Sequence, residues 1–241
     1  MKLGGLMHTP EVKKVLSIDM DYIMEPCINL YNDLCGGEDD SFNIWARVQE
    51  ARDIERHLSI NEENLLTINN VFTKNILNIK KENILFAENH DAILNLLCEG
   101  IPESQKYDIW NIDHHHDIYY NDESKHHVEK FNFTAMADWV WYLKSNNLLN
   151  NYTWVRNQNS APFYDIGNGF VFQEVSSHNI SKIMNLQFDY LFICKSPHWF
   201  PDKFHHYFEM LKNTASNLKS AVFETVKGGY CIDGKSRPLA R

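Results

Sequence analysis

One stretch of this chain places five titratable side chains in a row directly after an alternating apolar run: Tyr107–Tyr120 reads YDIWNIDHHHDIYY. Extended backbone sends every second side chain to the same side. We therefore expect Asp113, His115 and Asp117 to share one face, while the two histidines between them point the other way. Two carboxylates beside one imidazole are typical ligands of a divalent metal ion. A polar loop with incidental histidines is the alternative.

Residues of the same kinds follow three other apolar runs, each of which predicts a buried strand. Asp19 and Asp21 obey the same i, i+2 rule, although aspartates of a turn or helix cap are the alternative. His90 stands at the start of a predicted helix, where a core or cap histidine is the alternative. In parallel sheets, ligands gather beyond the carboxyl ends of the strands. One site is therefore predicted from four strand ends: Asp19 and Asp21, Glu88 and His90, Asp113 with His115 and Asp117, and His198.

The candidate ligands combine four carboxylates with two imidazoles. Such an oxygen-rich set suits Mn²⁺ or a similar divalent ion better than a thiolate zinc site. Six ligands are too many for one catalytic ion that keeps an open position, but they suit two ions bridged by a carboxylate and a water. Because such a pair lowers the pKa of the water, metal-assisted hydrolysis is the predicted reaction class. The six are Asp19, Asp21, His90, Asp113, His115 and Asp117.

The elements that must position these residues alternate between apolar strands and helices, which predicts an α/β fold: three α/β/α layers around a mostly parallel sheet. The segment Asn121–Lys130 is polar and predicted to be a loop. The predicted strands are Lys14–Asp19, Asn83–Ala87, Tyr107–Ile112, Tyr152–Val155, Gly169–Phe172 and Phe188–Cys194. The predicted helices are one beginning near Phe42, then Asn61–Leu77, Asp91–Glu99, Phe133–Lys144 and about Asp202–Leu218.

Length and composition narrow the function classes. A chain of 241 residues is expected to form one domain, residues 1–241. The net charge of −9 argues against nucleic-acid binding and leaves room for a cationic substrate. The five cysteines are scattered without a CxxC pair, which favours a reducing compartment. Without a signal-peptide core or a bilayer-spanning run, we expect a cytoplasmic protein that does not bind membranes.

Three segments resemble the metal-binding motifs of the arginase/agmatinase superfamily, the ureohydrolases. The segment 113–117 is similar to D-A-H-x-D, with His114 in the alanine position, and Glu88–His90 is similar to G-G-D-H. Ser17–Asp21, followed by Glu25–Pro26, is similar to S-x-D-V-D-x-x-D-P with one additional residue. That last motif comes late in ordinary arginases and first here. The order therefore resembles a circularly permuted branch that includes the peptide arginases of ribosomal peptide maturation.

This resemblance implies an arginase/deacetylase-like fold and two Mn²⁺ ions. Asp113 and Asp19 would bridge the ions. Asp117 would distinguish the site from that of the zinc deacetylases, which lack the full double set. By motif, the ligands would be His90, Asp19, Asp113 and Asp117 for one ion, and His115, Asp21, Asp19 and Asp113 for the other.

The resemblance also suggests residues for proton transfer and substrate binding. His127, in the loop expected after the central motif, would shuttle a proton, with His126 as the alternative. Asp117 would be catalytic as well as a ligand. Glu88 would bind a guanidinium group through charge-assisted hydrogen bonds, and His198 would line the pocket. For His127 and Glu88, solvation at a loop or a helix start is the structural alternative.

The reaction implied is hydrolysis of arginine to ornithine and urea. The segment after Asp117 lacks the Asn- and Ser-rich pattern with which arginases hold a free amino acid. This departure favours peptidyl arginine in a precursor peptide as the substrate. Two alternatives stay open: another metal-dependent C–N hydrolysis, agmatinase- or deacetylase-like, and a metal-stabilised binding protein without turnover. Beyond residues 19–117 the resemblance concerns the fold alone.

Overall fold

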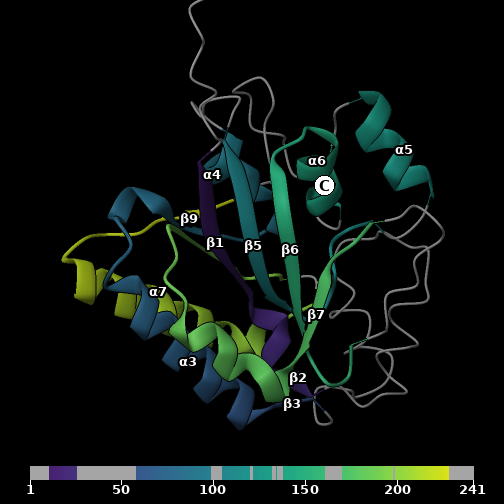
Figure 1. Ribbon diagram of the computed structural model, residues 1–241. Helices are drawn as coiled ribbons and strands as arrows, with labels where there is room; N and C mark the ends of the chain where they lie inside the picture. The colour runs from purple at the N-terminus through teal and green to yellow at the C-terminus, as the bar shows by residue number, and fades with distance from the viewer. Residues whose placement is uncertain are drawn as a thin grey trace, which may run out of the picture.

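The computed structural model describes residues 11–25, 58–98, 105–119, 122–131, 134, 138–160, 170–197 and 199–227. Seven strands form a central sheet in the order β7-β6-β5-β1-β8-β4-β9, and every neighbouring pair is parallel. Helices cover both faces of the sheet (Figure 1), which confirms the predicted three-layer α/β/α fold. The strands are β1 Val12–Asp19, β4 Ile84–Ala87, β5 Lys106–Asp113, β6 Leu149–Arg156, β7 Gln173–Ser176, β8 Tyr190–Cys194 and β9 Thr225–Val226, with a separate antiparallel pair of β2 Met24–Glu25 and β3 Ser59–Ile60.

The helices divide between the two faces of the sheet. On one side lie α3 Glu62–Ile76 and α7 His205–Lys219, and on the other α4 Ile93–Cys98, α5 Asp122–Phe131 and α6 Trp139–Ser145. The connecting segments contain 3₁₀ helices: η1 Met20–Ile23, η3 Lys81–Asn83, η4 His90–Ala92, η5 Ser177–Asn185 and η6 Asp202–Phe204. In β1, Leu16 and Ile18 pack in the core below α3 and α7, while Val15 packs in the core below α4 and α6. Since side chains alternate along a strand, Ser17 and Asp19 face the α4–α6 side.

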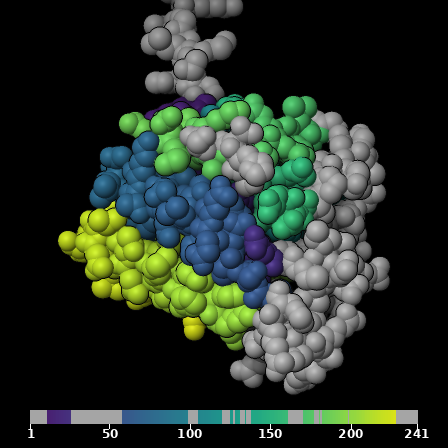
Figure 2. Space-filling model, turned by 90° about the horizontal axis from the view of Figure 1, so that it is seen from below, coloured from purple at the N-terminus to yellow at the C-terminus, as the bar shows by residue number. Residues whose placement is uncertain are grey.

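Helix α3 illustrates how local sequence sets an element's bounds. The side chain of Asn61 accepts a hydrogen bond from Asn64 N at 2.9 Å and caps the first turn. Leu65, Ile68 and Phe72 recur at helical spacing and are buried. On the surface, α3 and α7 lie side by side (Figure 2). Among the helices that the structure describes, none has both the length and the apolar character needed to cross a membrane.

The predicted loop Asn121–Lys130 is wrong, because helix α5 occupies Asp122–Phe131. The segment is rich in residues that favour helices, such as Glu and Lys, and it needs little apolar surface to dock. Val128 is buried, and the ammonium group of Lys125 lies 4.8 Å from the ring centroid of Trp141 on α6. This cation–π contact replaces an apolar stripe as the anchor of the helix.

Two further predictions need correction. The predicted strand Gly169–Phe172 is wrong, since the edge strand β7 begins at Gln173 and the described residues before it, 170–172, are not in a strand. The apolar character of that segment reflects packing, because Phe170 and Phe172 lie against the ring of Tyr152 at 6.4 and 6.1 Å. A helix was also predicted over Phe133–Lys144. Within the described residues of this segment, the helix begins at Trp139. The helix predicted near Phe42 lies outside the described residues.

Candidate metal centre

The sheet topology brings three ligand-bearing strands to one edge. Strand β1 lies between β5 and β8, and β4 lies on the far side of β8. Because all these strands run parallel, their carboxyl ends meet at the same edge. Asp19 ends β1, Asp113 ends β5, and His90 follows β4 after two residues. The convergence of these strand ends was predicted from the sequence, and the structure brings all six predicted ligands together there.

Three carboxylates converge on one nitrogen of His90. His90 Nδ1 lies 2.9 Å from Asp117 Oδ2, 3.1 Å from Asp19 Oδ2 and 3.3 Å from Asp113 Oδ2. All four side chains are buried, and His90 Nδ1 makes no hydrogen bond of acceptable geometry to any residue that the structure describes. One ring nitrogen cannot hydrogen-bond three carboxylates at once. Such an arrangement is that of ligands around a cation, and His90, Asp113 and Asp117 could hold a metal ion.

A second group of candidate ligands surrounds His115. Its Nδ1 lies 2.9 Å from Asp21 Oδ2 and 3.9 Å from Asp113 Oδ1, and these three residues could hold a metal ion as well. Asp113 therefore belongs to both groups. Its Oδ2 faces His90 and its Oδ1 faces His115. A carboxylate whose two oxygens face different imidazoles has the geometry of a bridge between two cations.

Neighbouring side chains fix the orientation of the His90 imidazole. Ser17 Oγ and His90 Nε2 form a hydrogen bond of 2.7 Å, which leaves Nδ1 facing the carboxylates. The ring is stacked between Trp139 at 5.0 Å and Phe192 at 5.5 Å. Partners of this kind hold a ligand histidine in one tautomer and one orientation.

The carboxylates are held in the same way. Trp139 Nε1 donates a hydrogen bond of 2.7 Å to Asp117 Oδ2, and Asn111 Nδ2 donates one of 2.9 Å to Asp113 Oδ2. The sequence reasoning did not single out Ser17, Asn111 or Trp139 for these roles. Ser17 and Asn111 each stand two residues before a ligand on the same strand face, so alternation could have indicated them. Trp139 comes from a later helix and carries no such signal.

The alternation of side chains along extended strands does not explain the position of every candidate ligand. Strand β5 ends at Asp113, and Asp117 has a positive φ of 50°, so the expected alternation from Asp113 to Asp117 is wrong beyond the strand. A turn brings Asp117 back toward His90. Similarly, Asp21 lies in the 3₁₀ helix η1, whose cap residue Asp19 accepts a hydrogen bond from Asp21 N at 3.1 Å. Asp19 is therefore a helix cap and a candidate ligand at the same time.

The histidines on either side of His115 have other surroundings. Among the residues that the structure describes, neither His114 nor His116 belongs to a group of candidate ligands. His116 Nδ1 accepts a hydrogen bond from Ile118 N at 3.1 Å, and its ring lies edge-on to Trp154. Burial and the nearby His115 lower the pKa of His114 well below its usual range and that of His116 to about 4.

Burial and the charges in the cluster shift the pKa values of Asp21 and His90. Burial, together with the charge on Asp19, raises the pKa of Asp21 well above its usual range. Burial alone would lower the pKa of His90, but the charge on Asp117 and the contacts with Asp113 and Asp19 outweigh it, so that pKa is raised. Both shifts favour the protonated forms, through burial and the charge on Asp19 for Asp21 and through the neighbouring carboxylates for His90.

Metal affinity is expected to rise with pH. Metal ligands bind in their deprotonated forms, and the raised pKa values of His90 and Asp21 favour protons with which a cation would have to compete. For each proton displaced, the apparent affinity should increase about tenfold per pH unit until the pH exceeds the raised pKa. Titration against chelator-buffered Mn²⁺ at several pH values measures this slope. An affinity independent of pH would show that no proton is displaced.

The structure describes only some of the residues predicted to bind substrate or transfer protons. Glu88 is half-buried after β4, and its Oε1 lies 3.9 Å from Lys195 Nζ. His127 lies on α5 and not in the expected loop, and its side chain is outside the described part of the structure. His126, on the same helix, is exposed. His198 lies outside the described residues. The assignments of Glu88, His127 and His198 stay predictions.

Cys194 is a fourth residue that sequence reasoning did not place at the site. It ends β8, is fully buried and could share a metal ion with Asp19 and His90. Burial and the charge on Asp19 raise the pKa of its thiol well above its usual range. Its position at a strand end was the available signal, but the scattered cysteines did not suggest a ligand.

Comparison of the chain with protein-family models, with curated proteins and with solved structures finds no match. What can be said of the protein therefore comes from its own residues. It has an α/β fold whose sheet edge holds buried Asp and His side chains, and these could bind metal ions.

Proposed function

We propose that this protein is a binuclear metal-dependent hydrolase of the ureohydrolase type. It would convert arginine, preferentially peptidyl arginine in a precursor peptide, to ornithine and urea. The observation that carries the proposal is Asp113, whose two oxygens face two separate groups of candidate ligands. A site for one ion would not need a carboxylate shared in this way.

The ligands divide into two sets around Asp113. One Mn²⁺ or similar ion would be held by His90, Asp19, Asp113 and Asp117, and the other by His115, Asp21 and Asp113, with Asp19 as a second bridge. When bound, the two ions would supply Lewis acidity and make a water molecule nucleophilic at neutral pH. The chain itself shields this region from bulk solvent, because the six side chains are mostly buried.

The exposure of the ligands indicates the direction of substrate entry. The side chain of His115 is 15% exposed, whereas the other five are 6% exposed or less. Trp199 lies against His115, with ring centroids 4.8 Å apart, and is half-buried. An indole ring beside the entrance suits a planar cation such as a guanidinium group. The net charge of −9 also favours a basic substrate.

Glu88 and His127 complete the proposed chemistry. Glu88 would bind the guanidinium nitrogens, in place of its 3.9 Å contact with Lys195. His127, or His126 beside it on α5, would protonate the departing amine as the bond to the guanidinium carbon breaks. The chain after Asp117 supports a peptide substrate, because it lacks the residue pattern with which arginases hold a free amino acid.

Incubation of the protein with Mn²⁺ and arginine-containing peptides tests this function. We expect urea release and the mass decrease that conversion of arginine to ornithine produces, with less product from free arginine or agmatine. Asp117→Asn, which changes a proposed ligand, should remove both signals. If no peptide or guanidine compound yields urea with any divalent metal, the proposal is wrong. Acetate release from acetylated amines would instead indicate deacetylase-like activity.

A further inference from the structure

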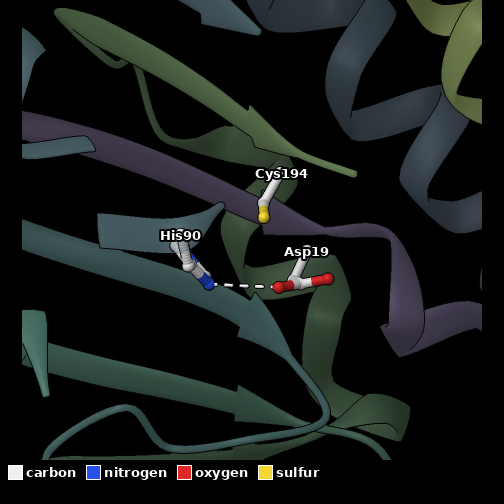
Figure 3. Close-up of side chains that lie close together, drawn as sticks. All are labelled: Asp19, His90 and Cys194. Carbon is white, nitrogen blue, oxygen red and sulfur yellow. Dashed lines mark ion pairs between the residues drawn. The ribbon is translucent and has the colours of Figure 1, made fainter. Parts of the chain in front are cut away.

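Strand β8 fills the gap between two strands that carry candidate ligands. It pairs with β1 on one side and β4 on the other, so His90 must reach over the end of β8 to meet Asp19. The last residue of β8 is Cys194, the register partner of both Asp19 and Ala87. In parallel strands, register partners project to the same face. The sulfur of Cys194 accordingly points toward the pair formed by Asp19 and His90 (Figure 3).

We propose that Cys194 is a thiolate ligand of the ion that His90 holds. This inference rests on the proposed two-ion site and adds a ligand to it. Ligand atoms of Asp19, His90 and Cys194 all lie within 4.8 Å of one another. Independently, His90 Nδ1 is buried without a hydrogen bond among the described residues and lies 3.1 Å from Asp19 Oδ2. An imidazole nitrogen, a carboxylate and a thiol that converge in a buried space are a metal-ligand set.

The thiol can release its proton without leaving a buried group unsatisfied. At present Cys194 Sγ donates a weak hydrogen bond to the carbonyl oxygen of Glu88 at 3.4 Å. Formation of the metal–sulfur bond would send that proton to solvent. The Glu88 carbonyl would still accept a hydrogen bond from Ser196 N at 3.0 Å. Among the hydrogen bonds of the Cys194 side chain, coordination would therefore remove one weak bond, and the nearby cation would have to offset the cost of removing the thiol proton.

This ligand would make the two metal positions chemically different. Sulfur is a soft donor that favours Zn²⁺ or Co²⁺ over Mn²⁺, whereas carboxylates favour Mn²⁺. The ion at His90 would gain nitrogen, oxygen and sulfur donors from the chain and leave little room for a further ligand. The ion at His115, beside the most exposed of the ligands, would keep the open position for substrate.

Loading of the full-length protein with Co²⁺ tests the inference. Cobalt–thiolate bonds give a charge-transfer absorption in the near ultraviolet. We expect this band with the intensity of one bound thiolate per chain. Cys194→Ser and Cys194→Ala should remove it, while Cys98→Ser should retain it, because half-buried Cys98 belongs to none of the candidate ligand groups among the described residues. Loss of the thiolate should weaken Zn²⁺ binding at least about tenfold and Mn²⁺ binding much less.

Elemental analysis separates the possible outcomes. Two Co²⁺ per chain without the charge-transfer band in the unmodified protein would overturn the assignment of Cys194 and leave the proposed function standing. The band without urea release from any substrate would support Cys194 as a ligand and contradict the proposed function. No metal uptake would overturn both. Absence of the band in the unmodified protein overturns the assignment of Cys194 even if the Cys194 variants do not fold.

Discussion

Asp113→Asn is expected to remove binding of both metal ions and to reduce kcat/KM on the substrate by roughly 1,000-fold or more. Asp113 is fully buried, and each of its carboxylate oxygens faces a different imidazole. An asparagine has one amide oxygen and one NH₂ group, so it can serve one cation at most and presents a donor to the other. The loss should exceed the 10–100-fold that changes beside a metal ligand typically cause.

The measurement combines metal content after dialysis with steady-state kinetics. Asp108→Asn is a matched control, because Asp108 lies on the same strand and, within the described part of the chain, accepts side-chain hydrogen bonds from Asn150 and Asn151 at the surface. The control should retain both ions and near-normal activity. Retention of two ions per chain by Asp113→Asn would show that this carboxylate does not bridge them.

Much of the site was predictable because short segments of the sequence indicate where each strand ends and which of its side chains share a face. The apolar runs at Lys14–Asp19 and Tyr107–Ile112 predict buried strands, and the residues that follow them are the ones that meet at the sheet edge. A parallel sheet leaves few other places for such polar groups, since both of its faces are covered. The α/β/α fold and the meeting of the ligand-bearing strand ends followed from the same pattern.

What the pattern could not predict depends on contacts between distant segments. Trp139 reaches Asp117 because the start of α6 lies beside the turn after β5, where Val140 N also donates a hydrogen bond to Asp117 O. Asp117 joins the cluster through a turn with positive φ, which alternation does not foresee. Helix α5 forms although its sequence is mostly polar, since Lys125 docks on Trp141. In each case the outcome depends on tertiary contacts that the hydrophobic pattern of the segment does not encode.

The same cluster explains why metal ions should stabilise the folded chain. The carboxylates of Asp19, Asp21, Asp113 and Asp117 are gathered in a buried space, where like charges repel and desolvation is costly. Burial raises the pKa of Asp21 and the neighbouring carboxylates raise the pKa of His90, so both surroundings favour proton binding that would offset part of this charge. Two divalent cations would neutralise this charge and coordinate His90 Nδ1, which has no hydrogen bond to the part of the chain that the structure describes.

Removal of metal with a chelator is therefore expected to lower the melting temperature markedly. Metal at about 1,000 times its Kd adds about 4 kcal/mol to the free energy of unfolding, which for a chain of this length corresponds to a rise in Tm of about 8–16 °C. Thermal melts in chelator and in Mn²⁺ measure the difference. Asp113→Asn should show a much smaller shift. Equal melting temperatures with and without metal would contradict a metal site in the core of the fold.

The size of this stabilisation should depend on pH in a definite direction. The folded-state pKa values of Asp21 and His90 are raised above their unfolded values. Their contribution to the stability of the metal-free chain is therefore fully present below the unfolded pKa and is lost as the pH rises through the folded pKa. Metal binding removes this loss, because the cation replaces the protons. The difference in Tm between metal-loaded and metal-free protein should thus widen as the pH is raised, and a difference that narrows would mean that the charge in this cluster is neutralised by some group other than a bound cation.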